Sequence, residues 1–189
     1  THKSGSMSCR QLLKKLQQAL NVTGELMDTN FPYHFITADG YTWYVSFSHS
    51  RQHAAVLISP YTNIGIDVED SAISHQVASR FFSPHEYQWL NQKPAVNQAV
   101  LRNLLWRLKE CAIKAHQNAD KQLIKELKHD VLDELGEEVI NQLIGAHEIN
   151  AKDKSKNKPK NKPIQCVQTN AKIIGNFSSQ PCSFIIVNR

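Results

Sequence analysis

Acidic and basic side chains occur at two points of this sequence in patterns that suit phosphate chemistry. Asp67 and Glu69 stand two residues apart in the run Gly-Ile-Asp-Val-Glu, and Glu110 stands with Lys109 and Lys114 in the run Trp-Arg-Leu-Lys-Glu-Cys-Ala-Ile-Lys. Carboxylate oxygens are ligands for divalent cations such as Mg²⁺, and lysine ammonium groups bind phosphate oxygens. The two runs together therefore indicate a site for a metal ion and a phosphate-bearing ligand.

The first run predicts a short strand over Ile64–Val68. Because successive side chains of a strand point to opposite faces, Asp67 and Glu69 share one face while Ile66 and Val68 share the other. Two neighbouring carboxylates repel each other unless water or a cation lies between them. Taken alone, an exposed strand end in water explains this pair as well as a metal site does.

The second run predicts part of a helix over Gln98–Ala115. Glu110 and Lys114 are four residues apart and share one helix face, and Trp106 lies one turn earlier. For the helix alone, a surface ion pair with Trp106 in the core is the better interpretation. The combination with the strand is what favours a functional site.

The segment Ser46–Ser50 offers further groups that could contact phosphate. It places the Ser48 hydroxyl, the His49 imidazole and backbone amides just before a predicted strand. Taken alone, a polar turn explains it more simply. A hydrolytic Ser–His pair is not indicated, because adjacent residues cannot easily form one and no acidic partner is placed beside them.

The elements that must position these groups follow from the pattern of apolar residues and turn residues. We expect a helix over Cys9–Leu20, and helices over Ser74–Phe82, from Ser83 to Asn91 and over Gln98–Ala115. Ser83, Pro84 and Glu86 form a capping-box start for the helix that follows them. Further helical segments are expected in Gln122–Ile144, broken near Gly136. Strands are expected over Phe31–Thr37, Tyr41–Phe47, His53–Ser59, Ile64–Val68, Cys166–Gln168, Ala171–Asn176 and Ser183–Val187. Strands, then helices, then strands predict an α+β fold.

Composition sets the class of protein. The chain has 189 residues, 41% of them hydrophobic, so it can bury a core, and its net charge is +5. The positive excess lies in a run of lysines within Ala151–Pro163, which predicts a polar, solvated loop. The basic balance is therefore weak evidence for nucleic-acid binding.

Cysteine use and the absence of a long apolar run indicate a reducing compartment. The chain has four cysteines without a Cys-x-x-Cys pair, and no stretch of its sequence is apolar enough to predict a membrane span. We therefore expect a cytoplasmic protein with no membrane partner. Residues 1–6 are interpreted as a cloning remnant outside the fold, with Met7 as the native start.

Taken together, these motifs resemble the 4′-phosphopantetheinyl transferase superfamily, and in particular its Sfp-type branch. That family carries a Gly-Ile-Asp-hydrophobic-Glu strand, a Phe-Phe-Ser-x-x-Glu stretch and a Trp-x-x-Lys-Glu-x-x-x-Lys helix. All of them occur here in order, with a Ser-His-Ser segment upstream, over roughly Ser46–Lys114.

The resemblance implies a role for most of the residues named above. The metal ligands would be Asp67, Glu69 and Glu110, holding Mg²⁺ with Mn²⁺ as the alternative ion. The contacts to the phosphates of coenzyme A, the substrate, would come from Ser48, His49, Lys109 and Lys114. The catalytic groups would be Asp67, Glu110 and Lys114. Glu86 also matches a family position but carries no assigned role.

The implied reaction moves the 4′-phosphopantetheine group of coenzyme A to a serine of an apo acyl or peptidyl carrier protein. The serine hydroxyl would attack the β-phosphate, and 3′,5′-ADP would leave. Lys114 would stabilise charge on the leaving side, and Glu110, directly or through metal-bound water, is the leading base. A monomer without a nucleic-acid partner is implied.

The implied architecture is a 4′-phosphopantetheinyl transferase-like fold of two related lobes in one chain, a pseudo-dimer with coenzyme A between them. The N-terminal lobe would be residues 7–63, which is short for this branch, and the C-terminal lobe would be residues 64–189 and carry the metal site. Candidates for binding the 3′-phosphate are the basic residues of the first lobe: Arg10, Lys14, Lys15 and Arg51. The glycine-rich segment that commonly follows the motif lysine is replaced here by residues 116–120.

Two other readings stay open at this point. One is a relative that is catalytically weak or inactive and binds coenzyme A or a carrier protein without transfer. The other is a nucleic-acid-binding protein that uses the lysine run, although this run lacks interleaved aromatic residues and a recognisable binding module.

Overall fold

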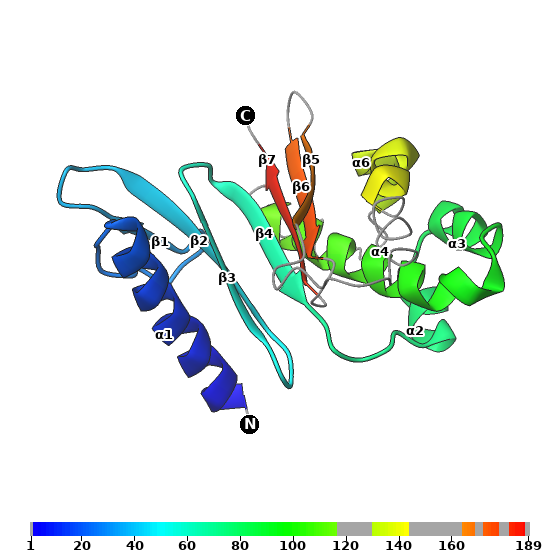
Figure 1. The fold of residues 1–189 in the computed structure, drawn as a ribbon, viewed down its shortest axis with the longest axis horizontal. Coiled ribbons are helices and arrows are strands. Elements are labelled where there is room, and N and C mark those ends of the chain that lie inside the picture. The colour runs from blue at the N-terminus through cyan, green and yellow to red at the C-terminus, as the bar shows by residue number, and fades with distance from the viewer. Residues whose placement is uncertain (1, 117–129, 144–163, 169–171, 178–181, 188–189) are drawn as a thin grey trace, which may run out of the picture.

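The computed structural model describes residues 2–116, 130–143, 164–168, 172–177 and 182–187 (Figure 1). These residues form two antiparallel sheets flanked by helices, which confirms the predicted α+β class. The predicted loop at 151–163 and the segment 117–129 lie outside the described residues.

The first sheet has the order β1-β2-β3 and carries one helix on its face. Its strands are β1 (His34–Ile36), β2 (Thr42–His49) and β3 (Ala54–Ser59), and the helix is α1 (His2–Leu20). Leu13 of α1 packs with Phe35 and Val45 of the sheet in one buried cluster. Residues 2–6, which the sequence analysis set aside, extend α1 by its first turn.

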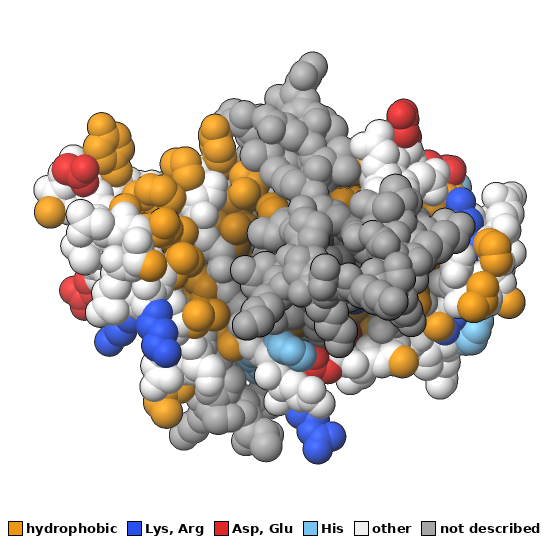
Figure 2. All heavy atoms as spheres, viewed as in Figure 1, with side chains coloured by type: hydrophobic (Ala, Val, Ile, Leu, Met, Phe, Trp, Pro, Cys, Tyr) orange, Lys and Arg blue, Asp and Glu red, His pale blue; other side chains and the backbone are white. Residues whose placement is uncertain are grey.

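The surface around the first sheet is rich in apolar side chains. Met27, Phe31, Ile36 and Tyr41 are all exposed, and hydrophobic side chains gather on the left of Figure 2, the side that β1 and β2 occupy in Figure 1. The core of this sheet is consequently small and one-sided, and it depends on α1.

The second sheet has the order β4-β7-β6-β5. Its strands are β4 (Asn63–Val68), β5 (Ile164–Gln168), β6 (Lys172–Phe177) and β7 (Cys182–Val187). The long helix α4 (Ala95–His116) packs on β4 and β7 and supplies more of the larger buried core than any other element, six of its sixteen buried residues. Chain segments more than 100 residues apart thus meet at β4 and β7, with Asp67 opposite Ser183.

Three shorter helices lie around α4: α2 (His75–Phe81), α3 (Pro84–Asn91) and α6 (Val131–Leu135) (Figure 1). The predicted capping box is confirmed, because the Ser83 hydroxyl accepts the Glu86 N–H while the Glu86 carboxylate accepts the Ser83 N–H. The predicted break at Gly136 is also confirmed: φ is +84° there, a conformation that favours glycine, and residues 137–143 are helical again.

The two sheets meet through serine side chains. The backbone N–H groups of Ile66 and Val68 donate to the hydroxyls of Ser46 and Ser48 on β2, each at 3.2 Å. A buried N–H that lacks a partner is costly, and here hydroxyls rather than a neighbouring strand satisfy this edge of β4. β2 therefore lies beside β4 without joining its sheet.

Gly65 allows α4 to approach β4 very closely. A Cβ atom at this position would lie 1.9 Å from the carbonyl oxygen of Cys111, which no packed structure tolerates. The contact fixes the height of α4 above β4, two residues before Asp67 on the strand and one residue after Glu110 on the helix. The Gly-Ile-Asp start of the strand motif is thus a packing requirement as well as a chemical signature.

Candidate active site

A cavity of about 370 Å³ lies where β2, β4 and α4 meet. Its lining joins predicted site residues from all three elements: Phe47, Ser48, His49, Asp67, Val68, Glu69, Trp106, Glu110 and Lys114. Apart from the candidates for the 3′-phosphate, every predicted metal, phosphate and catalytic residue except Lys109 is in this set. Asp67 and Glu69 share the cavity, as the strand pattern predicted, whereas Ile66 and Val68 pack in an apolar cluster and Val68 also borders the cavity.

Asp67 and Lys114 form the central ion pair of the cavity. The Lys114 ammonium lies 2.8 Å from Asp67 Oδ1 and also donates to the Ile66 carbonyl at 3.0 Å. Asp67 is buried, with 7% of its surface exposed. This burial argues against the alternative of an exposed strand end in water, and it makes the pairing of opposite charges necessary.

Ser48 binds the same pair from β2. Its hydroxyl donates to Asp67 Oδ1 at 2.9 Å, accepts the Val68 N–H at 3.2 Å and lies 3.3 Å from the Lys114 ammonium. All hydrogen-bonding positions of this hydroxyl are therefore occupied by protein groups. The predicted contact of Ser48 with phosphate would have to replace one of them.

Glu69 and Glu110 complete the acidic side of the cavity. Glu69 Oε1 accepts the Ser71 N–H at 2.7 Å, so this carboxylate is turned partly toward its own loop. Burial raises the pKa of Glu110, and the negative charges of Asp67 and Glu69 raise it further, against the opposing charge of Lys114. Three carboxylates that share one cavity in this way favour a bound cation, and the hard oxygen donors suit Mg²⁺.

Lys109 lies elsewhere, which corrects the prediction that it contacts phosphate. Its ammonium is 1% exposed and forms an ion pair with Glu86 at 2.8 Å. The reason is helical geometry: five residues separate Lys109 from Lys114, so the two side chains leave α4 in widely different directions. Lys109 points into the core beside Phe82, away from the cavity.

Glu86 is a buried structural residue that the sequence analysis left without a role. Besides Lys109, its carboxylate accepts the N–H groups of Ser83 at 2.7 Å and Val131 at 2.8 Å. One side chain therefore joins the beginnings of α3 and α6 to α4. The capping-box spacing in the sequence indicated the contact with Ser83. Nothing in the sequence indicated the contacts with Lys109 and Val131.

Arg107 is a second buried cation that sequence reasoning missed. It is 8% exposed and donates from Nε to the Ser183 hydroxyl at 3.2 Å. Ser183 of β7 is the residue that pairs with Asp67 of β4 in the sheet. Burial lowers the pKa of Arg107, while the negative charges of Asp67 and Glu69 act in the opposite direction. The only available signal was an arginine within a largely apolar stretch of helix.

Trp106 closes one wall of the cavity. It lines the cavity beside Glu110, and its ring meets Phe81 edge to face, with 5.6 Å between centroids. The core packing expected from the sequence is thus combined with a place in the cavity lining.

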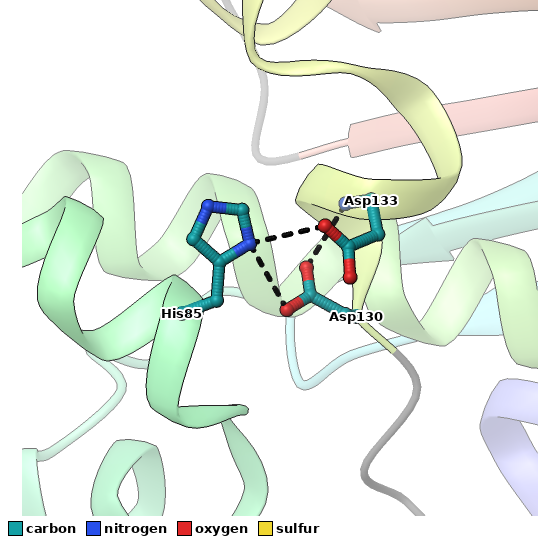
Figure 3. Close-up of side chains that lie close together, drawn as sticks. All are labelled: His85, Asp130 and Asp133. Carbon is teal, nitrogen blue, oxygen red and sulfur yellow. Dashed lines mark hydrogen bonds and ion pairs between the residues drawn. The ribbon is translucent and has the colours of Figure 1, made fainter.

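A second cluster of charged groups lies away from the cavity, between α3 and α6 (Figure 3). His85 Nδ1 is 3.3 Å from Asp130 and 3.2 Å from Asp133. Among the described residues, this is the one group of three whose possible ligand atoms all lie within 4.8 Å of one another. Asp130 is already engaged as the N-cap of α6, accepting the Leu132 and Asp133 N–H groups, so the cluster is explained as a clasp between helices.

The basic residues considered for the 3′-phosphate do not line the cavity. Lys14, Lys15 and Arg51 are exposed. Arg10, exposed on α1, pairs with Asp28 at 2.5 Å. Their assignment stays a prediction.

Comparison with known proteins agrees with the site. The sequence model of the 4′-phosphopantetheinyl transferase superfamily matches residues 63–164, more than half of the chain. The chain therefore belongs to this superfamily. The matched region contains the carboxylates and Lys114 of the cavity, whereas Ser48 and His49 precede it.

One curated relative is the 4′-phosphopantetheinyl transferase gsp of Aneurinibacillus migulanus. It is 38% identical to this chain over 71 residues, which are 37% of this chain and 30% of that protein. The chain thus matches less than a third of the relative's length. No solved structure matches the chain.

Proposed function

We propose that this chain is a 4′-phosphopantetheinyl transferase that moves the phosphopantetheine group of coenzyme A to a serine of an apo acyl or peptidyl carrier protein, releasing 3′,5′-ADP. The observation that carries the proposal is the cavity at β2, β4 and α4, where Asp67, Glu69 and Glu110 face Lys114. Membership of the superfamily supports the same activity. We propose that it acts as a cytoplasmic monomer of two related lobes.

The acidic residues fit a divalent cation. Asp67, Glu69 and Glu110 would hold Mg²⁺ or Mn²⁺, which would neutralise charge on the pyrophosphate of coenzyme A. Burial raises the pKa of Glu110, and the charges of Asp67 and Glu69 add to it; a cation held by these carboxylates would oppose that shift. The contact of Glu69 with the Ser71 N–H is the one that metal coordination would exchange.

The side chains of this protein would do the remaining work. Lys114, held by Asp67 and the Ile66 carbonyl, presents a fixed ammonium to the phosphates and to charge that develops on the leaving side. Glu110, directly or through metal-bound water, would take the proton of the attacking serine.

Ser48 and His49 divide the β2 side of the cavity between them. His49 lines the cavity and remains the proposed phosphate contact from this strand. Ser48 instead orients Asp67 and Lys114, because its hydroxyl is already bonded to both. This arrangement couples the strand of one sheet to the metal ligand of the other.

The activity is tested by incubating the protein with coenzyme A, Mg²⁺ and several apo carrier proteins, and weighing the carriers by mass spectrometry. We expect a phosphopantetheine adduct on at least one carrier, lost on adding a chelator and restored by Mg²⁺ or Mn²⁺. Asp67→Ala and Glu110→Ala should abolish transfer while the exposed Asp39→Ala control keeps it. A folded protein that binds coenzyme A but modifies no carrier would favour the inactive relative.

The metal site is tested separately from activity. Mn²⁺ binding can be followed by electron paramagnetic resonance, with the Asp67→Asn and Glu110→Gln variants compared with Asp133→Asn. Weaker binding in the first two alone supports the cavity as the metal site. Weaker binding only in Asp133→Asn would move the metal to the clasp between α3 and α6.

A further inference from the structure

Asp70 lies two residues after the end of β4 and does not line the cavity. Its carboxylate accepts the Ser50 hydroxyl at 2.5 Å and the Gln52 N–H at 2.8 Å, and it pairs with His53 Nδ1 at 2.5 Å. Its side chain is 14% exposed. One carboxylate thus binds groups from three residues of the turn between β2 and β3.

The turn that Asp70 holds is adjacent to the cavity. It is closed on itself by the Ser50 N–H donating to the His53 carbonyl at 2.9 Å and by the His53 N–H donating to the Ser50 hydroxyl at 3.2 Å. The residue just before it is His49, the last residue of β2, which lines the cavity. The position of His49 therefore depends on a turn anchored from the β4 side.

The loop after Asp70 is anchored in turn to α4. Asn103 accepts the Ile73 N–H at 2.9 Å and donates to the Ser71 carbonyl at 3.3 Å. Arg102 donates from Nε to the Ile73 carbonyl at 2.6 Å. A continuous set of polar contacts thus runs from α4 through the loop after β4 to the β2–β3 turn.

We propose that Asp70 is a positioning residue that locks the β2–β3 turn, and with it His49, against the cavity for binding the phosphates of coenzyme A. This inference rests on the proposed function. Asp70 itself touches neither the reacting groups nor the metal ligands' cavity. Its loss should lower the fraction of molecules with a binding-competent turn, which weakens apparent affinity in proportion.

The first test is coenzyme A binding by isothermal titration calorimetry. Asp70→Ala should weaken binding about tenfold, as expected if only about a tenth of the molecules keep the competent turn. The KM for coenzyme A should rise to match, while kcat at saturating coenzyme A changes by less than about twofold. Asp70→Asn keeps one acceptor oxygen but loses the charge, so its affinity for coenzyme A should lie between those of the parent and Asp70→Ala. Asp39→Ala should bind coenzyme A like the parent.

A second readout follows the turn itself. Hydrogen exchange of the Gln52 amide should become faster in Asp70→Ala and stay slow in Asp39→Ala. The double variant Ser50→Ala/Asp70→Ala should bind coenzyme A only slightly more weakly than Asp70→Ala alone, because both residues act through the same contacts. Additive losses would mean that the two residues act independently and would overturn the proposal.

The outcomes separate this inference from the proposed function. A parent protein that does not bind coenzyme A overturns the function. A parent that binds it, together with an Asp70→Ala variant that binds equally well or loses kcat with unchanged KM, overturns only the role of Asp70. Should Asp70→Ala fail to fold by circular dichroism, the Asp70→Asn titration decides, since unchanged affinity there has the same meaning.

Discussion

Two lysines of α4 lie five residues apart and form ion pairs of opposite kinds. Lys114 meets Asp67 at the wall of a cavity, with 22% of its side chain exposed, whereas Lys109 meets Glu86 in the core, with 1% exposed. The sequence motif contains both lysines, and its resemblance implied one role for both. A sequence motif can therefore identify the helix that carries a site, but the helical rotation between two residues decides which of them faces the cavity.

The buried pair should show the largest effect on stability. Glu86→Ala removes the carboxylate partner of the buried Lys109 ammonium and also the acceptor of two backbone N–H groups, so we expect a loss of about 3–5 kcal/mol. Chemical denaturation followed by circular dichroism measures it. A loss below about 1 kcal/mol would mean that water reaches this pair.

A neutral replacement sharpens the same point. Glu86→Gln combined with Lys109→Met removes both charges and keeps one acceptor oxygen. Because Ser83 and Val131 donate to different oxygens of Glu86, this variant should restore only part of the stability. The folded double variant should retain transfer. Lost transfer in a folded double variant would return Lys109 to the site.

The cavity pair should show its effect in catalysis. Lys114→Met removes the ammonium proposed to face the phosphates of coenzyme A, and we expect transfer to fall about 10²–10³-fold, the usual effect of losing one group that stabilises developing charge. Initial rates of carrier modification measure it, and thermal unfolding provides the stability control. Equal losses for Lys109→Met and Lys114→Met, at equal folded fraction, would erase the distinction between the two lysines.

Gly65 tests how the cavity pair is placed. Gly65→Ala puts a methyl group against the Cys111 carbonyl and should force α4 away from β4, costing about 1–3 kcal/mol by overpacking. Transfer should fall more than stability alone explains, because Lys114 and Asp67 sit on the two separated elements. Gly40→Ala crowds no neighbouring atom but places alanine at a φ of +86°, so it measures the cost of backbone strain without overpacking.

The clasp of α3 and α6 should contribute the smallest effect, and it depends on pH. A hydrogen bond to Glu137 and the charges of Asp130 and Asp133 raise the pKa of His85 above its ordinary 6.5. The stabilisation is therefore complete below pH 6.5 and is lost as the pH rises through the raised pKa. The thermal midpoint of the parent should fall over this window more than that of His85→Gln. Parallel curves would show that the clasp carries no net stabilisation.

Much of the fold near the site could be predicted because its signals are local. The capping box at Ser83, the break at Gly136 and the alternation of Asp67 and Glu69 with apolar residues depend only on neighbours in sequence. Each of these predictions is confirmed where the structure describes the residues. The gathering of β2, β4 and α4 around one cavity was implied by family resemblance and could not be derived from periodicity.

The misplaced and missed residues have partners distant in sequence. Lys109 and Glu86 are 23 positions apart, and Asp70 binds a turn 17 to 20 positions earlier. Such pairings depend on how helices and strands pack, and a single sequence carries no signal for them. Ser48 illustrates the same limit: its hydroxyl suits phosphate chemically, but packing gave it to Asp67 and Val68.

The serine contacts between β2 and β4 also bear on self-association. The edge of a sheet normally presents unpaired N–H and C=O groups that can recruit a strand from another molecule. On this edge of β4, the hydroxyls of Ser46 and Ser48 accept two N–H groups and Lys114 donates to the Ile66 carbonyl. These contacts satisfy the edge of β4 and so prevent another strand from pairing with it. Substitutions at Ser46 or Ser48 should therefore lower solubility as well as disturb the cavity.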